Sequence, residues 1–317
     1  MRVPRFPWLA VLGLMTLQLG TIPSFAPAAE VAFTRTEDVV YGRKWGMALT
    51  MDVFRPKEDQ EVKQNGAGLI LVVSGGFFSD KAAINKGFVQ PFVNRGYTVF
   101  AVVHGSQPRF TIPEAIQDMQ RAVRFIRTNA KQFKVDPDKL GIFGGSAGGH
   151  LSLMIGTAGA AGNPKAGDPV ERASSRVQAV ACFFPPTDFL NWGQPGKDVL
   201  GKNVLKGFKA PFDFLEFDGP SKSFLPVTDE AKLHKIGKEI SPIYHVSADD
   251  PPSLIIHGDA DKLVPIQQAE ILIEKMKEAK VECELIVRKG AGHGWLTMPN
   301  DLVLFGNWFD RHLLKKE

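Results

Sequence analysis

Short apolar runs, separated by stretches with helical periodicity, dominate the hydrophobic pattern of this chain. Six runs are almost continuously apolar: Leu69–Val73, Thr98–Val103, Leu140–Phe143, Val177–Phe183, Ser253–Ile256 and Val281–Val287. Such runs are typical of parallel strands that are buried on both faces of a sheet. Nearer the N-terminus, Val39–Tyr41 and Met47–Phe54 flank two glycines, which predicts an antiparallel hairpin. In its second strand, Leu49, Met51 and Val53 would share one face.

The stretches between these runs predict helices with one apolar face. Thr111 and Glu114 form a capping box, and apolar residues then recur every three or four positions up to residue 126. The same spacing is present in residues 266–276 and 302–309. Strands that alternate with helices predict an α/β fold. We expect a mostly parallel, doubly wound sheet with the N-terminal antiparallel hairpin at one edge.

Composition and charge fit a folded protein of this class and exclude several others. The chain has 317 residues, of which 44% are hydrophobic and 23% are charged, so it can bury a large core. This composition excludes a disordered, collagen-like or coiled-coil protein. The 38 basic and 34 acidic residues give a net charge of +4, and no run of like charges is present. The sequence therefore predicts no nucleic-acid partner.

The N-terminus has the marks of a secretory signal peptide. Arg2 and Arg5 precede a mostly apolar stretch, Trp8–Gly20, which is too short to span a membrane comfortably. Ala26-Pro-Ala28 then ends it in a signal-peptidase pattern. We expect cleavage of residues 1–28, a secreted or periplasmic location and no stable membrane insertion. Cleavage would remove two arginines and leave residues 29–317 with a net charge of +2.

An oxidising destination raises the question of a disulfide between Cys182 and Cys283. Both cysteines lie in strand-like runs, and the predicted topology puts another strand between them. We therefore expect two buried free thiols rather than a bridge.

The clearest chemical signal is the segment Gly144-Gly-Ser146-Ala-Gly148. It fits the nucleophile elbow, in which a strand turns sharply into a helix and holds a serine in a strained, exposed conformation. A side chain at Gly144 or Gly148 would collide with the neighbouring strand or helix. The segment follows an apolar strand and opens the apolar stretch 151–155, a context that favours an elbow over an ordinary glycine-rich turn. Ser146 is the candidate nucleophile.

An elbow serine needs a histidine base and an orienting carboxylate, and in this fold the carboxylate precedes the histidine along the chain. His257 ends a strand and is expected to hold its turn, and His312 lies on a terminal helix, where a solvated position is usual. His293 lies in a glycine-rich loop directly after the last strand, so we predict that it is the general base and acid. Asp259 and Asp261 are both candidates for the carboxylate. Asp261 is favoured because Asp259 is nearer the strand end and could bind amides of its own turn.

An oxyanion hole is expected from the loop after the strand at residues 69–73 and from the amide that follows the nucleophile. Gly75 and Gly76 in this loop allow the backbone to approach a substrate closely. The predicted donors are the amides of Gly76, Phe77 and Ala147. The alternative is an ordinary turn between a strand and a helix.

These motifs resemble the α/β-hydrolase superfamily, and more narrowly the secreted carboxylesterases related to the hormone-sensitive-lipase and the feruloyl or acetyl-xylan esterase groups. The resemblance covers most of the chain after residue 28. It includes the elbow Gly-Gly-Ser146-Ala-Gly-Gly-His, the acid motif Asp261-Lys-Leu-Val-Pro and the loop Gly-His293-Gly. It supports Asp261 over Asp259, and it implies an α/β-hydrolase fold and ester hydrolysis that needs no metal or cofactor.

Two loops depart from the pattern of that family. Its His-Gly-Gly-Gly-Trp oxyanion loop reads Ser74-Gly-Gly-Phe-Phe78 here, which puts Phe77 where glycine is common and would narrow the pocket. The Asn-Tyr-Arg that follows the next strand in the family reads Val103-His-Gly105 here, which removes a structural arginine.

Between Phe183 and Ser253 the chain is longer than a crossover between strands requires. We interpret residues from about 187 to 240 as a cap insertion that covers the active site as a lid. Its aromatic residues would either line an acyl or aromatic-ester pocket or pack the cap onto the body. They are Phe189, Trp192, Phe208, Phe212, Phe214, Phe217 and Phe224.

The sequence therefore predicts a serine carboxylesterase that hydrolyses short-acyl or carbohydrate-linked esters, of the acetyl or feruloyl type, through an acyl-enzyme. Its partner is expected to be a small-molecule or polysaccharide-linked ester. One alternative is a serine peptidase of the prolyl-oligopeptidase type, which normally carries a propeller before the hydrolase body. The other is a non-catalytic ligand-binding member of the fold. Members of that kind have usually lost the histidine, which is present here as His293.

Overall fold

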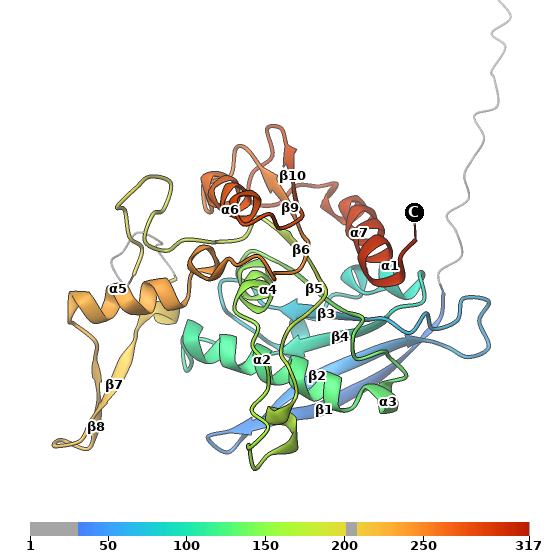
Figure 1. Cartoon of the computed structure of the whole chain (residues 1–317), viewed down its shortest axis with the longest axis horizontal. Coiled ribbons are helices and arrows are strands. Elements are labelled where there is room, and N and C mark those ends of the chain that lie inside the picture. Colours follow the sequence, from blue (N-terminus) through green and yellow to red (C-terminus); the bar gives the residue numbers. More distant parts are fainter. Residues whose placement is uncertain (1–30, 201–207, 317) are drawn as a thin grey trace, which may run out of the picture. The chain divides into compact units, whose positions relative to one another are not determined.

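The computed structural model of the protein describes residues 31–200 and 208–316 (Figure 1). The predicted signal peptide, residues 1–28, lies outside the described residues. From Val31 onward the chain forms one compact unit. The strands of its main sheet are β1 (Phe33–Lys44), β2 (Met47–Pro56), β3 (Gly68–Val73), β4 (Thr98–Val103), β5 (Leu140–Gly145), β6 (Ala179–Phe183), β9 (Ser253–Gly258) and β10 (Cys283–Arg288). In the described part of the chain, these eight strands pair in the order β1-β2-β4-β3-β5-β6-β9-β10.

Each predicted apolar run forms a parallel strand of this sheet, from β4 at one side to β10 at the edge. β1 and β2 form the predicted antiparallel hairpin, which joins the sheet because β2 pairs with β4. β1 begins at Phe33 rather than at the predicted Val39. Its backbone pairs with β2 from Phe33 to Thr36, and a register shift separates this part from Val39, although its side chains there are exposed or half-buried. Hydrophobic alternation alone therefore underestimates the length of this edge strand.

The two faces of the sheet bury different side chains of the same strands. Along β3, Ile70 and Val72 belong to one core. Leu69 and Leu71 belong to the other, because successive side chains of a strand point to opposite faces. The helices that cover the first core are α2 (Ile112–Thr128), α4 (Ala147–Thr157) and α6 (Gln267–Glu278), and those that cover the second are α1 (Gln90–Val93) and α7 (Leu302–Leu314). Figure 1 shows α2 and α4 on one side of the sheet and α1 and α7 on the other, as expected of a doubly wound sheet.

The helix starts and the short elements follow local sequence signals. At the start of α2, the predicted capping box is present, because the amide of Thr111 donates to the carboxylate of Glu114 at 2.8 Å. Two further helices are α3 (Ala130–Phe133) and α5 (Glu230–Glu239), and 3-10 turns occur at Lys81–Ala83, Lys86–Phe88, Pro169–Arg172, Ala210–Phe212, Pro242–His245 and Met298–Asp301. Within the described residues, no helix is long and apolar enough to cross a membrane.

The chain between β6 and β9 holds a separate hairpin beside α5. Its strands, β7 (Leu215–Asp218) and β8 (Ser223–Pro226), pair with each other and project from the body (Figure 1). Phe217 and Phe224 meet edge to face across this hairpin but remain mostly exposed. Residues 201–207 of the predicted cap lie outside the described residues, and its action as a lid stays a prediction.

The two cysteines are free thiols, as predicted, and β9 lies between their strands. Cys182 on β6 is fully buried, and burial raises the pKa of its thiol. Cys283 is only half-buried, which differs from the prediction. The reason is its position on β10, which is the edge strand of the sheet and is covered less completely than β6.

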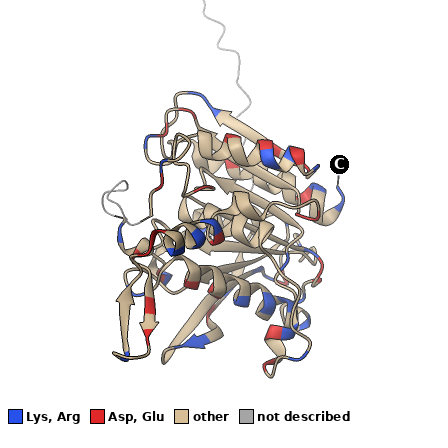
Figure 2. Ribbon diagram, turned by 60° about the vertical axis from the view of Figure 1, so that its left-hand side comes forward, with Lys and Arg blue, Asp and Glu red and all other residues tan. Residues whose placement is uncertain are grey.

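Charged side chains are mixed over the molecule. Figure 2 shows Lys and Arg interspersed with Asp and Glu along the same helices. Some form local networks, such as the one in which Arg121 contacts Asp168 at 2.8 Å and Glu171 at 2.7 Å. This distribution is consistent with the near-balance of charge in the sequence.

Candidate active site

Ser146 lies at the sharp turn between β5 and α4. Its backbone angles, φ 53° and ψ −119°, are strained for a residue that has a side chain. The turn is held on both sides, because the Ser146 amide donates to the carbonyl of Phe183 at 3.0 Å and its carbonyl accepts from the amide of His150 at 2.9 Å. The serine hydroxyl is thereby presented at the edge of the sheet where the parallel strands end.

The glycines of the elbow allow two backbone segments to approach closely. A Cβ atom on Gly144 would lie 2.7 Å from the backbone of Gly148. A Cβ atom on Gly148 would lie 2.8 Å from the carbonyl oxygen of Val72 on β3. Both distances are shorter than real Cβ contacts, and backbone atoms cannot rotate out of the way. The predicted steric role of these two glycines is therefore confirmed.

The structure brings the three residues of the predicted triad together. His293, in the loop after β10, lies with Nδ1 2.7 Å from the carboxylate of Asp261 and with Nε2 2.9 Å from Oγ of Ser146. An ionised carboxylate can only accept, so Nδ1 carries the proton. The Nε2 atom is then the acceptor of the Ser146 hydroxyl proton. This is the tautomer that a general base for Ser146 requires.

Asp261 is held as an acceptor by several donors. Burial by itself would raise the pKa of its carboxyl group, but hydrogen bonds from His257, His293 and the amide of Val264 outweigh that effect and hold the pKa well below its usual range. The amides of Leu263 and Val264 donate to its other oxygen at 2.8 and 3.0 Å. The carboxylate is therefore ionised at neutral pH and is fixed in direction.

The other candidates from the sequence have different positions. His257 holds its turn, as expected, because its ring Nε2 donates to the carbonyl of Val264 at 2.9 Å. Asp259 does not bind its own turn: it accepts from the amide of Gly290, in the loop that carries His293, at 2.6 Å. His312 is not a solvated surface residue. Its side chain is only 11% exposed, because the terminal helix packs this side against the body, and its ring lies 4.4 Å from that of Trp308, one turn earlier on the same helix.

The loop after β3 carries the predicted oxyanion donors. Gly75 and Phe78 form two backbone hydrogen bonds with each other, one in each direction. The two residues between them have left-handed backbones, with φ 55° at Gly76 and 64° at Phe77. Ala147 is the first residue of α4, where a helix leaves its amides unpaired. The amides of Gly76, Phe77 and Ala147 donate to no acceptor within residues 31–200 and 208–316.

The two departures from the family pattern lie against each other. β3 and β4 are adjacent parallel strands, so Ser74 and His104 follow them side by side. The His104 ring lies with Nδ1 2.8 Å from the carbonyl of Gly105 and with Nε2 2.9 Å from Oγ of Ser74. A carbonyl only accepts, so Nδ1 donates and Nε2 accepts the Ser74 proton. Burial lowers the pKa of His104 to about 4, which keeps the ring neutral.

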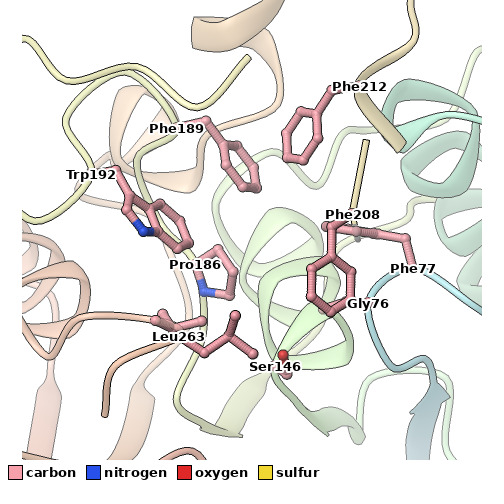
Figure 3. Close-up of a pocket in the computed structure, with 11 residues that line it drawn as sticks. Gly76, Phe77, Ser146, Pro186, Phe189, Trp192, Phe208, Phe212 and Leu263 are labelled. Carbon is pink, nitrogen blue, oxygen red and sulfur yellow. The ribbon is translucent and has the colours of Figure 1, made fainter. Parts of the chain in front are cut away.

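An apolar pocket opens beside Ser146 (Figure 3). Aromatic side chains from the cap form much of its wall, and the ring of Phe208 lies so close to Gly76 that a Cβ atom there would be 2.2 Å from it. Phe217 and Phe224 do not belong to the wall, because the hairpin carries them away from it. The lining residues are Gly76, Phe77, Ser146, Ala147, Pro186, Phe189, Trp192, Phe208, Phe212, Leu263 and Val264.

Phe189, Trp192 and Phe212 of the cap line the pocket and also pack the cap, and their binding of an acyl group stays a prediction. The rings of Phe189 and Trp192 stack at 6.0 Å and 6°. Phe189 meets Phe212 edge to face at 5.2 Å, and Phe212 meets Phe77 of the oxyanion loop at 6.5 Å. This chain of rings connects the cap with the body across the pocket.

Sequence reasoning missed a residue that supports the histidine. The ring of Phe184 lies 4.4 Å from the ring of His293, and its backbone has an unusual φ of 35°. The signal available was its position, since Phe184 directly follows β6 at the edge where Ser146 lies. The described residues contain no group of three or more His, Cys, Asp or Glu side chains arranged to hold a metal ion.

Comparison with protein families decides which family this site belongs to. The BD-FAE family model matches residues 51–276, which include Ser146, Asp261 and the oxyanion loop. The chain belongs to the BD-FAE family. His293 follows the matched range, in the loop after β10.

Two proteins similar to this BD-FAE chain are named as ester hydrolases. The probable carboxylic ester hydrolase LipM of Mycobacterium tuberculosis is 27% identical over 245 residues, which are 76% of this chain and 51% of LipM. The acetylxylan esterase of Xylanibacter ruminicola is 26% identical over 253 residues, 78% of this chain and 44% of that protein. This chain thus spans about half the length of the curated relatives it matches.

Solved structures support the same fold for this BD-FAE member. A truncated carbohydrate esterase from gut microbiota is 27% identical with a TM-score of 0.67, over 89% of this chain and 98% of its own. The butyrate-bound esterase Est2 of Thermogutta terrifontis is 23% identical with a TM-score of 0.67, over 91% and 97% of the two chains, and this likeness concerns the fold alone. The predicted α/β-hydrolase fold is confirmed.

Proposed function

We propose that this protein is a serine carboxylesterase. The observation that carries the proposal is the hydrogen-bonded series Asp261–His293–Ser146, with contacts of 2.7 and 2.9 Å, beside an apolar pocket. A nucleophile within reach of a base, and a base oriented by a carboxylate, is the arrangement that acyl transfer needs. The descriptions of LipM and of the gut carbohydrate esterase support the same reaction.

In the proposed mechanism, Ser146 transfers its hydroxyl proton to Nε2 of His293 as Oγ attacks the ester carbonyl carbon. Asp261 accepts from Nδ1 throughout and stabilises the imidazolium that forms. The carbonyl oxygen becomes an oxyanion, and the amides of Gly76, Phe77 and Ala147 would bind it. His293 then gives its proton to the leaving alcohol. Water, deprotonated by the same nitrogen, cleaves the acyl-enzyme and restores Ser146.

The proposed substrates are short-acyl or carbohydrate-linked esters of the acetyl or feruloyl type. The acyl group would enter the pocket and contact the wall formed by Phe189, Trp192 and Phe212. This wall offers apolar contacts and few polar partners. The alcohol would then extend past the exposed edge of the oxyanion loop. The similarity to an acetylxylan esterase supports a sugar as one such alcohol.

A single variant tests the proposed nucleophile. Ser146→Ala should lower kcat on p-nitrophenyl acetate by at least about 10⁴-fold, because the group that forms the acyl-enzyme is gone. Circular dichroism should be unchanged, since an alanine fits the same turn. The matched control, Ser221→Ala on the exposed hairpin, should keep the activity of the wild type. Full turnover by Ser146→Ala would rule out the assignment.

A substrate panel separates the esterase from its alternatives. The panel contains p-nitrophenyl acetate and butyrate, methyl ferulate, acetylated xylan and a chromogenic dipeptide amide. We expect ester cleavage to exceed amide cleavage by several orders of magnitude. Faster release from the peptide amide would favour a serine peptidase, and tight binding of an ester without turnover would favour a ligand-binding protein.

We also propose that the protein is exported. The basic start, the apolar stretch and the Ala26-Pro-Ala28 pattern support this proposal. The intact mass of the protein recovered from a secreting host should correspond to residues 29–317. A product that retains Met1 in the membrane fraction would contradict cleavage, and one that retains Met1 in the cytoplasm would contradict export.

A further inference from the structure

The loop after β4 acts as a frame for the oxyanion loop after β3. Because Val73 and Val103 are paired in register, the two loops leave the sheet side by side. Several hydrogen bonds join them over a short length of chain. They are His104 Nε2 to Ser74 Oγ, the His104 amide to Ser79 Oγ, the Ser79 amide to Ser106 Oγ, the Gln107 amide to the Phe77 carbonyl, and Gln107 Nε2 to the Gly76 carbonyl.

The turn that carries the oxyanion donors has a conformation that its sequence disfavours. The amide of each of Gly75 and Phe78 donates to the carbonyl of the other at 2.9 Å. Both residues between them have positive φ. This is the geometry of a type I′ turn, which prefers glycine or asparagine at its central positions. Gly76 satisfies that preference, but Phe77 does not, since a left-handed backbone is strained in a bulky residue. Contacts outside the turn must therefore hold it.

Gln107 makes those contacts on both central residues. Its amide donates to the carbonyl of Phe77 at 3.2 Å, and its side-chain Nε2 donates to the carbonyl of Gly76 at 3.2 Å. The side chain is buried, so this bond is shielded from water. Gln107 thus binds the two carbonyl groups that the turn leaves free.

The bond to Gly76 also sets the direction of a predicted oxyanion donor. The carbonyl of Gly76 and the amide of Phe77 belong to one planar peptide group, in which the C=O and N–H bonds point in opposite directions. When Gln107 holds the carbonyl on its side, the Phe77 N–H must point away from Gln107. Gly76 and Phe77 also line the pocket that contains Ser146. Donation to the carbonyl also polarises the peptide and strengthens its N–H as a donor.

We propose that Gln107 is a positioning residue of the oxyanion hole, which it aims by holding the Gly76–Phe77 peptide. The inference rests on the proposed esterase function. It does not give Gln107 any contact with the substrate. Its role is to keep one donor in the direction that the transition state requires, so its loss should affect the transition state more than the bound substrate.

Two variants test this role. Gln107→Met keeps the length of the side chain but has no donor, and Gln107→Glu keeps its shape but presents an acceptor to the Gly76 carbonyl. Both should lower kcat on p-nitrophenyl acetate by about 10- to 100-fold, which approaches the loss caused by removal of one oxyanion donor. KM should change by less than about threefold. The inhibition constant of an alkylboronic acid, which forms a tetrahedral adduct on serine, should rise by the same factor as kcat falls.

A glutamine in the loop between β2 and β3 provides the matched control. Gln64 is partly buried and donates to Thr98 Oγ1 at 2.8 Å, beside the opposite end of β4. Gln64→Met should lower stability as much as Gln107→Met does, without changing kcat or boronic acid affinity. If the two variants affect kcat equally, or if both Gln107 variants turn over like the wild type, the inference is wrong. If Gln107→Met does not fold, the near-isosteric Gln107→Glu decides.

The same experiment distinguishes failure of the inference from failure of the proposed function. A wild-type protein without ester turnover, or one whose turnover survives Ser146→Ala, overturns the proposed function. Wild-type turnover that Ser146→Ala abolishes and Gln107→Glu preserves overturns only the role of Gln107.

Discussion

The pocket beside Ser146 has two sides that are held by different kinds of contact. One is the body, with the sheet and its loops, and the other is the cap between β6 and β9. On the body side, main-chain atoms touch main-chain atoms: a Cβ atom on Gly148 would be 2.8 Å from the Val72 carbonyl, and one on Gly258 would be 2.2 Å from the Ala291 carbonyl. On the cap side, the contacts are between rings, such as those of Phe189 and Trp192, at centroid distances of 5 to 6 Å.

This difference separates what must be constant from what can change. Backbone contacts leave no room for a side chain in place of these glycines. The body side therefore holds Ser146, His293 and the predicted oxyanion donors in one geometry. Ring contacts on the cap side can be rebuilt by exchange of side-chain volume with smaller consequences for the fold. We infer that the body side determines the reaction and the cap side determines which acyl group is accepted.

The largest effect is expected from the orienting carboxylate on the body side. Asp261→Asn should lower kcat on p-nitrophenyl acetate by about 10⁴-fold, because an amide can stabilise the wrong tautomer of His293. Steady-state kinetics on the purified variant measures this. Asp259→Asn is the matched control, because the Asp259 carboxylate accepts from the Gly290 amide in the same pair of loops and not from His293, and it should lose far less activity. Equal losses in the two variants would contradict the assignment of Asp261.

The next effect concerns two buried histidines of the body, of which His150 on α4 also contacts a ring of the cap. Burial lowers the pKa of His104, behind the oxyanion loop, and of His150, which packs against Phe77 and Phe189, to about 4. The ordinary value is 6.5, so between pH 6.5 and 4 the unfolded chain binds more protons than the folded one. Stability should therefore be complete above pH 6.5 and fall as the pH drops towards 4, by about 3 kcal/mol for each histidine.

Urea unfolding at pH 7.5, 5.5 and 4.5 measures this loss. The two histidines are expected to contribute equally to the loss of stability at low pH. His104→Gln removes one of them, so it should halve this contribution to the pH dependence of the free energy of unfolding. The exposed His234→Gln should leave it unchanged. If His104→Gln has the same pH dependence as the wild type, the ring does not stay neutral in the folded protein.

A smaller effect on stability is expected from one added methyl group on the body side. Gly148→Ala should lower the free energy of unfolding by about 1–3 kcal/mol, because its Cβ meets the Val72 carbonyl and neither backbone can yield. Thermal unfolding measures the change. Gly167→Ala is the control, since nothing lies within 4 Å of a Cβ atom there, and it should match the wild type. A Gly148→Ala variant as stable as the control would show that the body side can adjust.

The smallest effect is expected on the cap side, as a change of preference rather than of rate. Trp192→Ala removes part of the pocket wall, so the ratio of kcat/KM for a hexanoyl ester to that for an acetyl ester should rise about 10-fold. Phe217→Ala, on the exposed hairpin outside the pocket, should leave the ratio unchanged. If Trp192→Ala lowers both esters equally, the cap aromatics only pack the cap, and the division proposed above fails.

Much of the fold was predictable because its signals are local. The apolar runs that became β4 and β9 are continuous, and the capping box of Thr111 and Glu114 lies within four residues. The elbow around Ser146 depends on glycines next to it in the sequence. Errors arose where exposure depends on neighbours: Cys283 is half-buried because its strand is at the edge, and His312 is mostly covered because of how its helix lies on the body.

The sequence by itself determined the order of strands and helices, the strained turn at Ser146 and the loops that carry Asp261 and His293, because periodicity and glycine sterics act over a few residues. Only the tertiary structure decided that Ser74 meets His104, that Gln107 holds the Gly76 carbonyl and that the cap rings close the pocket. These contacts join segments far apart in the chain. They depend on β4 lying beside β3 and on how side chains fill the space between them, which no local pattern specifies.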